Sequence, residues 1–531
     1  MNSPLYLGFD CSTQSFTAIV IEQADPKDPA SGKILLEKSL NFDTVFPGFG
    51  TRNGVLPSSR PGLAHTPPQL WVKALETLIA ELKSAGIDLS RVASIAVSGQ
   101  QHGSVYLNAA GIRSLASLDP RRGLAEQMEG GYSRATSPIW MDATTSAQCA
   151  EITAALGGDE KVCALTGSRV FERFTGPQIR KFAQEEPAAY AATREVMLVS
   201  SFIPSLLAGK AIGIDPGDGA GMSLMDLAAC RWSGAALRAT APDLDTRLSP
   251  VAPSDTVAGA IAPYYVERFG FASGCRILPG TGDNPASLVG LGLIARGRIG
   301  ISLGTSDVLF AYMQSPKTDP DGNSHVFGSP TGAYMALSVY KNGSLAREAV
   351  RKRFDLSWEK FSDILKQTAP GNGGKVLLPY FDTEIIPRIN TPGEVRIGLD
   401  ASDAAGHVRG VIEAQMVSMK LHSAWMGETP TSIAATGGAS NNLAILQVMA
   451  DVFGVTVSRQ ESTAAAALGA AVRAQHGYLK AIGAEAGWEA LTEPHLKPSV
   501  VLKPDTQAHR AYADFAARYA KAEAEYVARL R

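Results

Sequence analysis

Residues 5–22 read LYLGFDCSTQSFTAIVIE, and this stretch decides the fold. Two runs rich in apolar, β-branched and aromatic residues, Leu5–Phe9 and Phe16–Glu22, flank the polar segment 11–15 (CSTQS). Apolar runs separated by a few small polar residues predict two strands joined by a short turn. Asp10 then stands at the end of the first strand, directly before the turn.

The pattern continues outward from this hairpin. Residues 33–42 predict a third strand, and a loop rich in Gly, Pro and Ser follows over 47–68. Apolar residues recur at helical spacing over 70–82, which predicts an amphipathic helix that ends near Gly86. Residues 92–97 predict another strand. The order β-β-β-α-β indicates an α/β domain.

A second turn, Gly304-Thr305-Ser306-Asp307, lies between predicted strands at 299–303 and 308–313. Gly300 precedes Thr305 by five positions, as Gly8 precedes Thr13. We interpret the two turns as one supersecondary unit used twice. Predicted strands at 334–339 and 432–436 and a helix over 443–453 follow. The expected domains are 1–290 and 291–531, and the second ends in a helix from about residue 505.

Composition narrows the class of protein. The chain has 531 residues, 45% hydrophobic and 19% charged, with a formal net charge of -2. These values are typical of a globular protein and leave no basic surplus for a nucleic-acid partner. Five scattered cysteines predict neither a zinc site nor a disulfide framework. Without a signal peptide or a long apolar run, we expect a cytoplasmic protein with no membrane partner.

The two turns predict phosphate contacts. Phosphate groups need backbone N–H donors, small hydroxyls and close approach of the chain, which Thr13, Gln14, Gly304 and Thr305 offer. Asp10 could hold Mg²⁺ through water. Two ordinary β-hairpins with Ser/Thr turns are the alternative, although their matching positions favour the first reading.

Gly437 and Gly438 follow a predicted strand and precede a helix, where the backbone can approach a nucleotide closely. Asn441 could add a polar contact. The alternative is a tight strand-to-helix connection with Ser440 or Asn441 as N-cap. The chain contains neither GxxxxGK[ST] nor a GxGxxG after a strand, which disfavours P-loop and dinucleotide-binding folds.

Residues 281–285 (TGDNP) follow a short predicted strand at 276–278 and place a carboxylate beside an amide. Transfer of a phosphoryl group to an alcohol needs a carboxylate that accepts the hydroxyl proton, and Asp283 fits that role with Asn284 as its neighbour. A plain Asp-Asn-Pro turn is the alternative, and this segment alone fits it equally well.

Other polar side chains suit sugar hydroxyls, namely Gln101, His102 and Arg173. A structural histidine and a solvated surface arginine are the alternatives for the last two. Trp140 and Asp142 could form an apolar wall and a polar anchor for a sugar, while core packing is equally compatible with the tryptophan.

Taken together, these segments resemble the FGGY family of carbohydrate kinases, and within it the members that phosphorylate D-xylulose. The similarity runs from about residue 5 to about residue 476. The motifs are moderately specific one by one and strongly specific in their shared order. The segments that carry it are 8–15, 98–106, 166–176, 281–287, 302–307 and 435–440.

The resemblance implies two ribonuclease-H-like domains of the actin/hexokinase type, with the active site in the cleft between them, and it implies ATP and Mg²⁺. By the same resemblance Asp283 is the base on a terminal ketose hydroxyl, while Asp10 rather than Asp283 is the expected partner of the metal. Many family members carry Arg where this chain has Thr144, so that contact is not expected. The resemblance assigns His102, Arg173 and Asn284 to the sugar, and Thr13, Gly304, Thr305, Trp358, Gly437, Gly438 and Asn441 to the nucleotide. Beside them we expect Gln101 and Trp140 at the sugar and Gln14 at the nucleotide.

Other functions stay open at this point. The same fold could act on L-ribulose, L-xylulose or a polyol, or serve as a catalytically silent sugar-binding regulator. An actin- or chaperone-like ATPase would need a partner-binding segment, and none is evident in the sequence. The expected partners are a small sugar and ATP, and the expected assembly is a monomer or homodimer.

Overall fold

The computed structural model describes residues 3–25, 28, 31–460, 464–484 and 486–530. The chain divides into two compact units that interleave along the sequence. The expected domains 1–290 and 291–531 stay a prediction. The two units do not correspond to one division of the chain, because the late segment Thr463–Leu496 belongs to the first unit. Unit 1 comprises Met1–Ile294, Val326–Tyr334 and Thr463–Leu496, and unit 2 comprises Ala295–His325, Met335–Ser462 and Lys497–Arg531.

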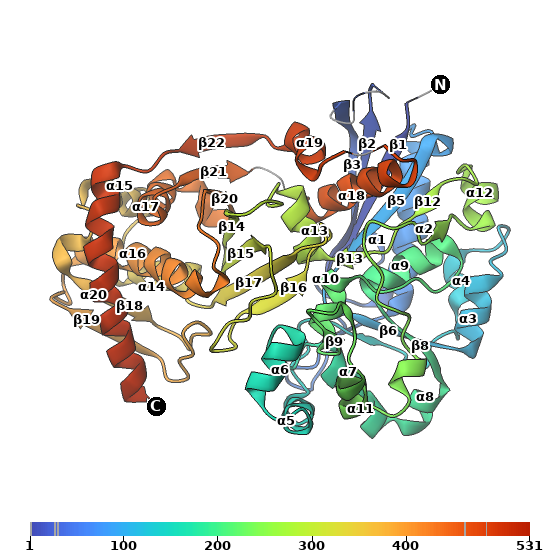
Figure 1. Ribbon diagram of the computed structural model, residues 1–531, viewed down its shortest axis with the longest axis horizontal. Helices are drawn as coiled ribbons and strands as arrows, with labels where there is room; N and C mark the ends of the chain where they lie inside the picture. Colours follow the sequence, from blue (N-terminus) through green and yellow to red (C-terminus); the bar gives the residue numbers. More distant parts are fainter. Residues whose placement is uncertain (1–2, 26–27, 29–30, 461–463, 485, 531) are drawn as a thin grey trace. The chain divides into compact units, whose positions relative to one another are not determined.

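Unit 1 is built on a mixed sheet in the order β11-β12-β5-β1-β2-β3, and β13 also pairs with β5 (Figure 1). The β1 strand runs antiparallel to β2 and parallel to β5. The predicted hairpin and the strand after the helix therefore meet in one sheet. The bounds are β1 (Leu5–Cys11), β2 (Ser15–Gln23), β3 (Gly32–Asn41), β5 (Val92–Gly99), β11 (Gly259–Ala260), β12 (Arg276–Ile277) and β13 (Thr281–Gly282).

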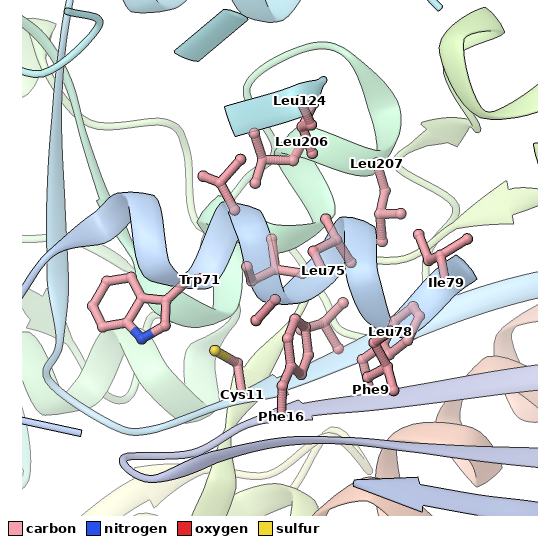
Figure 2. Packing of buried hydrophobic residues seen from close by; sticks show 14 of the residues in the cluster. Phe9, Cys11, Phe16, Trp71, Leu75, Leu78, Ile79, Leu124, Leu206 and Leu207 are labelled. Carbon is pink, nitrogen blue, oxygen red and sulfur yellow. The ribbon is translucent and has the colours of Figure 1, made fainter. Parts of the chain in front are cut away.

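One face of this sheet packs on α2 (Pro68–Ser84), the helix predicted from apolar spacing. Figure 2 shows Leu75 of α2 over Phe16 of β2 and Leu78 above Phe9 of β1, with Trp71 of α2 to their left. All five side chains are fully buried. Burying a large apolar side chain stabilises a fold by about 1.5–3 kcal/mol, so this face is a major part of the core.

The other face of the sheet packs on α18 (Ala465–Ala481), which also contacts α13 (Asp283–Gly290). Alternation along β1 explains the two faces, because Phe9 points toward α2 while Tyr6 packs with the α18 residues. The contact needs glycine: a Cβ on Gly8 would lie 2.2 Å from the backbone N of Ala471. The opening strand is therefore buried on both faces.

Unit 2 repeats the arrangement, with its strands in the order β17-β15-β14-β20-β21-β22. The β14 strand is antiparallel to β15 and parallel to β20, as β1 is to β2 and β5. The shared order confirms the α/β class and the repeated ribonuclease-H-like unit. The bounds are β14 (Arg298–Leu303), β15 (Asp307–Met313), β17 (Tyr334–Tyr340), β20 (Ser432–Thr436), β21 (Thr456–Gln460) and β22 (Pro498–Leu502).

The helices of unit 2 include the two predicted from the sequence, α17 and the terminal α20. Neither Ser440 nor Asn441, the N-caps named in the alternative reading, caps α17: Asn442 does, and Gly438–Asn441 form a short 3₁₀ turn before it. Among the described residues, no helix is both long and apolar enough to cross a bilayer. The main helices are α14 (Ser344–Arg353), α15 (Trp358–Gln367), α16 (Ala404–His422), α17 (Leu443–Phe453) and α20 (Thr506–Leu530).

Candidate functional site

Two carboxylates meet at one edge of the unit 1 sheet. Asp10 is the penultimate residue of β1 and pairs in register with Ser98 of β5. Ser98 also pairs with Thr281 of β13. Asp283 follows β13 directly. The expected loop at 281–285 is instead a strand end that passes at once into helix α13, whose first residue is Asp283. The carboxyl ends of three parallel strands thus bring Asp10 and Asp283 together.

The environment raises the pKa of both carboxyl groups above the usual range. Burial raises the pKa of Asp283 to about 6. Burial and then the nearby charge of Asp283 raise the pKa of Asp10 to about 7, against a hydrogen bond of 2.7 Å from the Ser98 hydroxyl to Asp10 Oδ1. Like charges held close together repel, so a proton or a bound cation at this edge is favourable.

The carboxylate pair suits a magnesium ion that has few protein ligands. Among the described residues there is no group of three or more His, Cys, Asp or Glu side chains that could hold a metal. Mg²⁺ commonly takes one or two carboxylates and completes its shell with water and substrate phosphates. Asp10 and its neighbour Asp283 therefore suit an ion that a nucleotide brings with it.

Asp283, Asn284 and Gln101 form one hydrogen-bonded group. The backbone N–H of Asn284 donates to Asp283 Oδ1 at 2.9 Å. The Asn284 side-chain amide donates to Gln101 Oε1 at 2.8 Å, and Gln101 Nε2 donates to the carbonyl of Gly217 at 3.4 Å. The structure thus brings three of the residues expected at a sugar site into contact.

His102 is held in one tautomer. Its Nδ1 lies 3.0 Å from the carbonyl oxygen of Gly221, which can only accept, so Nδ1 carries the proton. Burial and then the charge of Arg173 lower the pKa of His102 to about 3, so the ring is neutral. Nε2 is then an acceptor, suited to a sugar hydroxyl. A Cβ on Gly221 would lie 2.7 Å from the His102 ring, so this packing needs glycine.

Arg173 lies close to His102, around the ring of Phe174. The His102 and Phe174 rings are 4.7 Å apart between centroids. The Arg173 guanidinium carbon is 5.8 Å from the centroid of Phe174 and 5.1 Å from that of Phe171. An acceptor on His102 and donors on Arg173 give this corner the polarity that a polyhydroxylated molecule requires.

Trp140 is joined to the first turn. Its indole N–H donates to the Thr13 hydroxyl at 2.8 Å, and that hydroxyl donates to Gln100 Oε1 at 3.3 Å. The indole is 46% exposed. Gln14 beside it is exposed, and its carbonyl accepts from the backbone N–H of Phe42 at 2.9 Å. Trp140 thus offers an open aromatic surface beside the turn.

Asp142 does not behave as a sugar anchor. Its carboxylate is buried and accepts from the backbone N–H groups of Ala64 and Thr144, each at 3.0 Å, and from Gln178 Nε2 at 2.8 Å. Hydrogen bonds, those of His65 and Thr144 foremost, outweigh the effect of burial and hold its pKa well below the usual range. Asp142 therefore fixes the loop that carries Trp140.

A cavity of about 650 Å³ in unit 2 gathers most residues expected at a nucleotide site. Its walls come from the second turn, from α14 and α15, and from the segment that links β20 to α17. The volume is in the range of small-molecule pockets. The lining residues are Leu303, Gly304, Thr305, Ser344, Arg347, Trp358, Glu359, Ser362, Gly438, Ala439, Asn441, Asn442 and Ile445.

The glycine pair has two distinct roles in this cavity. Gly437 has a φ of 83°, and a Cβ there would lie 2.6 Å from the carbonyl oxygen of Leu303. Gly438 lines the cavity and has open space at its Cβ position. Gly437 therefore makes the close approach to β14 possible, while Gly438 leaves room for a ligand.

Trp358 and Asn441 frame the cavity from two sides. The Trp358 indole is 46% exposed. The Asn441 amide is partly occupied, because Oδ1 accepts from Arg459 at 3.3 Å and Nδ2 donates to the carbonyl of Gly438 at 3.1 Å. An open indole face is suited to stacking against an aromatic base.

The sequence reasoning missed several residues at both places. In unit 1 the carbonyls of Gly217 and Gly221 orient Gln101 and His102, and buried Asp218 accepts from the Ser200 hydroxyl. The density of Gly and Asp over 215–221 was the available signal. In unit 2 the cavity also includes Ser362 and Asn442, which are hydrogen-bonded to each other at 2.7 Å, and Arg347, for which no motif gave a signal.

Comparison with known proteins places these features in a family. The N-terminal domain model of the FGGY family of carbohydrate kinases matches residues 135–290, and the C-terminal domain model of that family matches residues 299–478. The chain is 40% identical to a xylulose kinase of Rattus norvegicus, over 99% of this chain and 97% of that protein. It is 40% identical to xylulose kinase 2 of Arabidopsis thaliana, over 90% and 87% respectively. The crystal structure of a xylulose kinase from Rhodospirillum rubrum has the same fold, with a TM-score of 0.80, 21% identity and 99% of each chain covered.

Proposed function

Because the chain belongs to the FGGY family of carbohydrate kinases and is thus an ATP-dependent sugar kinase, we propose that it converts D-xylulose to D-xylulose 5-phosphate with Asp283 as the general base. The observation that carries the proposal is the carboxylate pair at the ends of β1 and β13, beside a group of sugar-compatible side chains. The names of the relatives at 40% identity support D-xylulose as the substrate.

Asp283 has the properties of a base at neutral pH. Its pKa of about 6 leaves the carboxylate mostly ionised at pH 7, yet basic enough to take a proton as the sugar oxygen attacks phosphorus. The N–H groups of Asn284 hold Oδ1 in place. In the reaction, the hydroxyl proton passes to Asp283 while the oxygen forms its bond to the γ-phosphorus and ADP leaves.

The sugar is held by groups of defined polarity. His102 Nε2 accepts from a hydroxyl, Arg173 donates, and the Gln101–Asn284 pair lies beside the base. The open face of Trp140 covers the sugar from the side of the first turn. A neutral, polyhydroxylated ketose suits this mixture better than a charged substrate, because His102 is neutral.

The nucleotide occupies the cavity of unit 2. The base stacks against Trp358, Gly438 and Asn441 lie beside the adenosine, and the turn at 304–306 receives the phosphates. Thr13 and Gln14 of the matching first turn contact the phosphoryl group that is transferred. Asp10 is the residue that would hold Mg²⁺, which when bound neutralises charge on the phosphate oxygens.

We also propose a reducing compartment, the cytoplasm, as the site of action. The five cysteines, all within the described residues, form no disulfide, and four of them are buried. Disulfides are rare where glutathione keeps thiols reduced.

A coupled assay of ADP release tests the proposed function. We expect D-xylulose to stimulate turnover well above L-xylulose, L-ribulose and polyols at matched concentrations. Preference for another sugar would correct the substrate while leaving the kinase intact. Near-normal turnover by an Asp283→Asn variant would refute the role of the base. As a second test, Asn284→Asp puts a carboxylate in place of the amide that donates to Asp283 Oδ1. The pKa of Asp283 should then rise, and the fall in kcat/KM should move to higher pH.

A further inference from the structure

A buried ion pair lies behind the second turn. Arg347 of α14 is 1% exposed, and its guanidinium makes a two-pronged contact with Asp307: Nη1 to Oδ2 at 2.7 Å and Nη2 to Oδ1 at 2.9 Å. Asp307 is the first residue of β15, directly after the turn at 304–306. Arg347 also lines the unit 2 cavity. The pair therefore forms part of the wall behind the turn.

The ion pair is hydrogen-bonded to both the backbone carbonyl and the backbone N–H of Gly304. The carbonyl of Gly304 accepts from the backbone N–H of Ser344 at 2.9 Å, from the Ser344 hydroxyl at 2.6 Å and from Arg347 Nη2 at 3.4 Å. The backbone N–H of Gly304 donates to the Asp307 carboxylate. These contacts fix the peptide planes on both sides of Gly304, and with them the start of the turn.

The pair is in turn held by a third element. Arg347 Nη1 donates to Gln415 Oε1 of α16 at 2.9 Å. Gln415 Nε2 donates to the carbonyls of Asn342 and Gly343 at 2.7 and 2.9 Å. A Cβ on Gly343 would lie 2.7 Å from the carbonyl oxygen of Thr305. The turn is therefore packed closely against Gly343 and held through Arg347 and Gln415.

A buried ion pair of this kind is seldom explained by stability. Taking both charges out of water is costly, and the attraction between them often does no more than offset that cost. Fixing donors before a charged ligand arrives, in contrast, increases its binding because the site needs no rearrangement. We propose that Arg347 is a positioning residue that holds the turn at 304–306 in the shape that receives the phosphate chain of the nucleotide.

This role rests on the proposed function, since it assumes that the turn contacts phosphates and that Trp358 contacts the base. It makes a selective prediction: loss of Arg347 weakens phosphate recognition and spares adenosine recognition. A residue that only maintained the fold would weaken both equally.

Titration calorimetry with AMP, ADP and ATP, without sugar, tests the selectivity. For Arg347→Lys, which keeps the charge but not the two-pronged geometry, we expect the Kd of ADP and ATP to rise at least tenfold and that of AMP to change less than twofold. The matched control is Arg351→Lys. Arg351 is one turn further along α14, and its guanidinium carbon lies 5.4 Å from the Trp358 ring. Any effect of that variant should be equal for the three nucleotides.

Equal losses for AMP and ATP, or no loss with Arg347→Lys, would overturn the proposal. If that variant fails to fold, Ser344→Ala removes only the hydroxyl contact to the Gly304 carbonyl. It should show the same selectivity at two- to fivefold, and an unselective effect would again overturn the role. Wild-type protein that binds none of the nucleotides would refute the proposed function and this role together, whereas wild-type binding with unselective variants would refute this role alone.

Discussion

Replacing Asp10 with Asn should abolish activity and at the same time stabilise the protein. In the native fold Asp10 is ionised at high pH although burial and then Asp283 oppose the charge, which raises its pKa from the ordinary value of 3.8 to about 7. Asn keeps the shape of the side chain and an oxygen that can accept from Ser98. Because the carboxylate is the residue proposed to hold Mg²⁺, we expect kcat to fall at least a hundredfold.

The magnitude follows from the pKa. A difference of one unit corresponds to about 1.4 kcal/mol, so the full rise corresponds to about 4 kcal/mol at high pH. Asp10 is partly exposed to water, which screens the charge, and we expect about 1–2 kcal/mol of added stability. The folded-state pKa lies above the unfolded one, so wild type regains stability as pH falls from about 7 toward 4. The advantage of Asp10→Asn is therefore full above pH 7 and disappears near pH 4.

Urea unfolding of wild type and variant between pH 4 and 8, with EDTA present, measures this difference. The control is Asp142→Asn. A Ser98→Asn variant would not serve, because it changes the hydrogen bond from the Ser98 hydroxyl to Asp10. The pKa of Asp142 lies below its usual range, so its replacement should destabilise at neutral pH. An Asp10→Asn protein that is less stable than wild type at pH 8, or equally more stable at pH 4 and 8, would refute the reasoning.

Further outcomes follow from the same geometry. Asp283→Asn should lower kcat by about 10²–10⁴-fold while sugar binding, followed by calorimetry, stays near wild type. In wild type, kcat/KM should fall about tenfold per pH unit below about pH 6 as Asp283 is protonated, and a rate constant down to pH 4.5 would contradict this. Gly221→Ala places a methyl group 2.7 Å from the His102 ring and should raise the KM for sugar at least tenfold without changing the Kd of ADP. Trp358→Ala should raise the Kd of ADP about tenfold. Because Trp358 is exposed, ADP should also quench tryptophan fluorescence more strongly in wild type than in the variant. An unchanged Kd would exclude stacking there.

Local patterns predicted the hairpins, the helix over 70–82 and α17 because each is encoded by neighbouring residues. Strand β1, for example, alternates between side chains that face α2 and side chains that face α18. The position of Asp283 was harder to predict. It depends on β13 pairing with β5, a contact between segments far apart in the chain, and the segment 281–285 by itself fitted a turn equally well.

The polar supports could not be predicted from the sequence. Arg347 is charged and lies on a helix whose other charged residues are exposed or half-buried, so its spacing gives no sign that it is fully buried. The carbonyls of Gly217 and Gly221 act through backbone atoms, which carry no side-chain signature. Asn442 was missed in favour of Ser440 or Asn441 because a 3₁₀ turn of four residues precedes α17.

The return of α18 to unit 1 has a consequence for how the chain is made. During synthesis, β1 leaves the ribosome first, but the helix that covers Gly8, Ala286 and Gly290 is encoded more than four hundred positions later. Until then the small-residue face of this sheet has no native cover, and other apolar segments can reach it. A fragment that stops before residue 464 would keep this face exposed, so we expect the first half of the chain to need either the late helix supplied as a separate peptide or a chaperone to stay in solution.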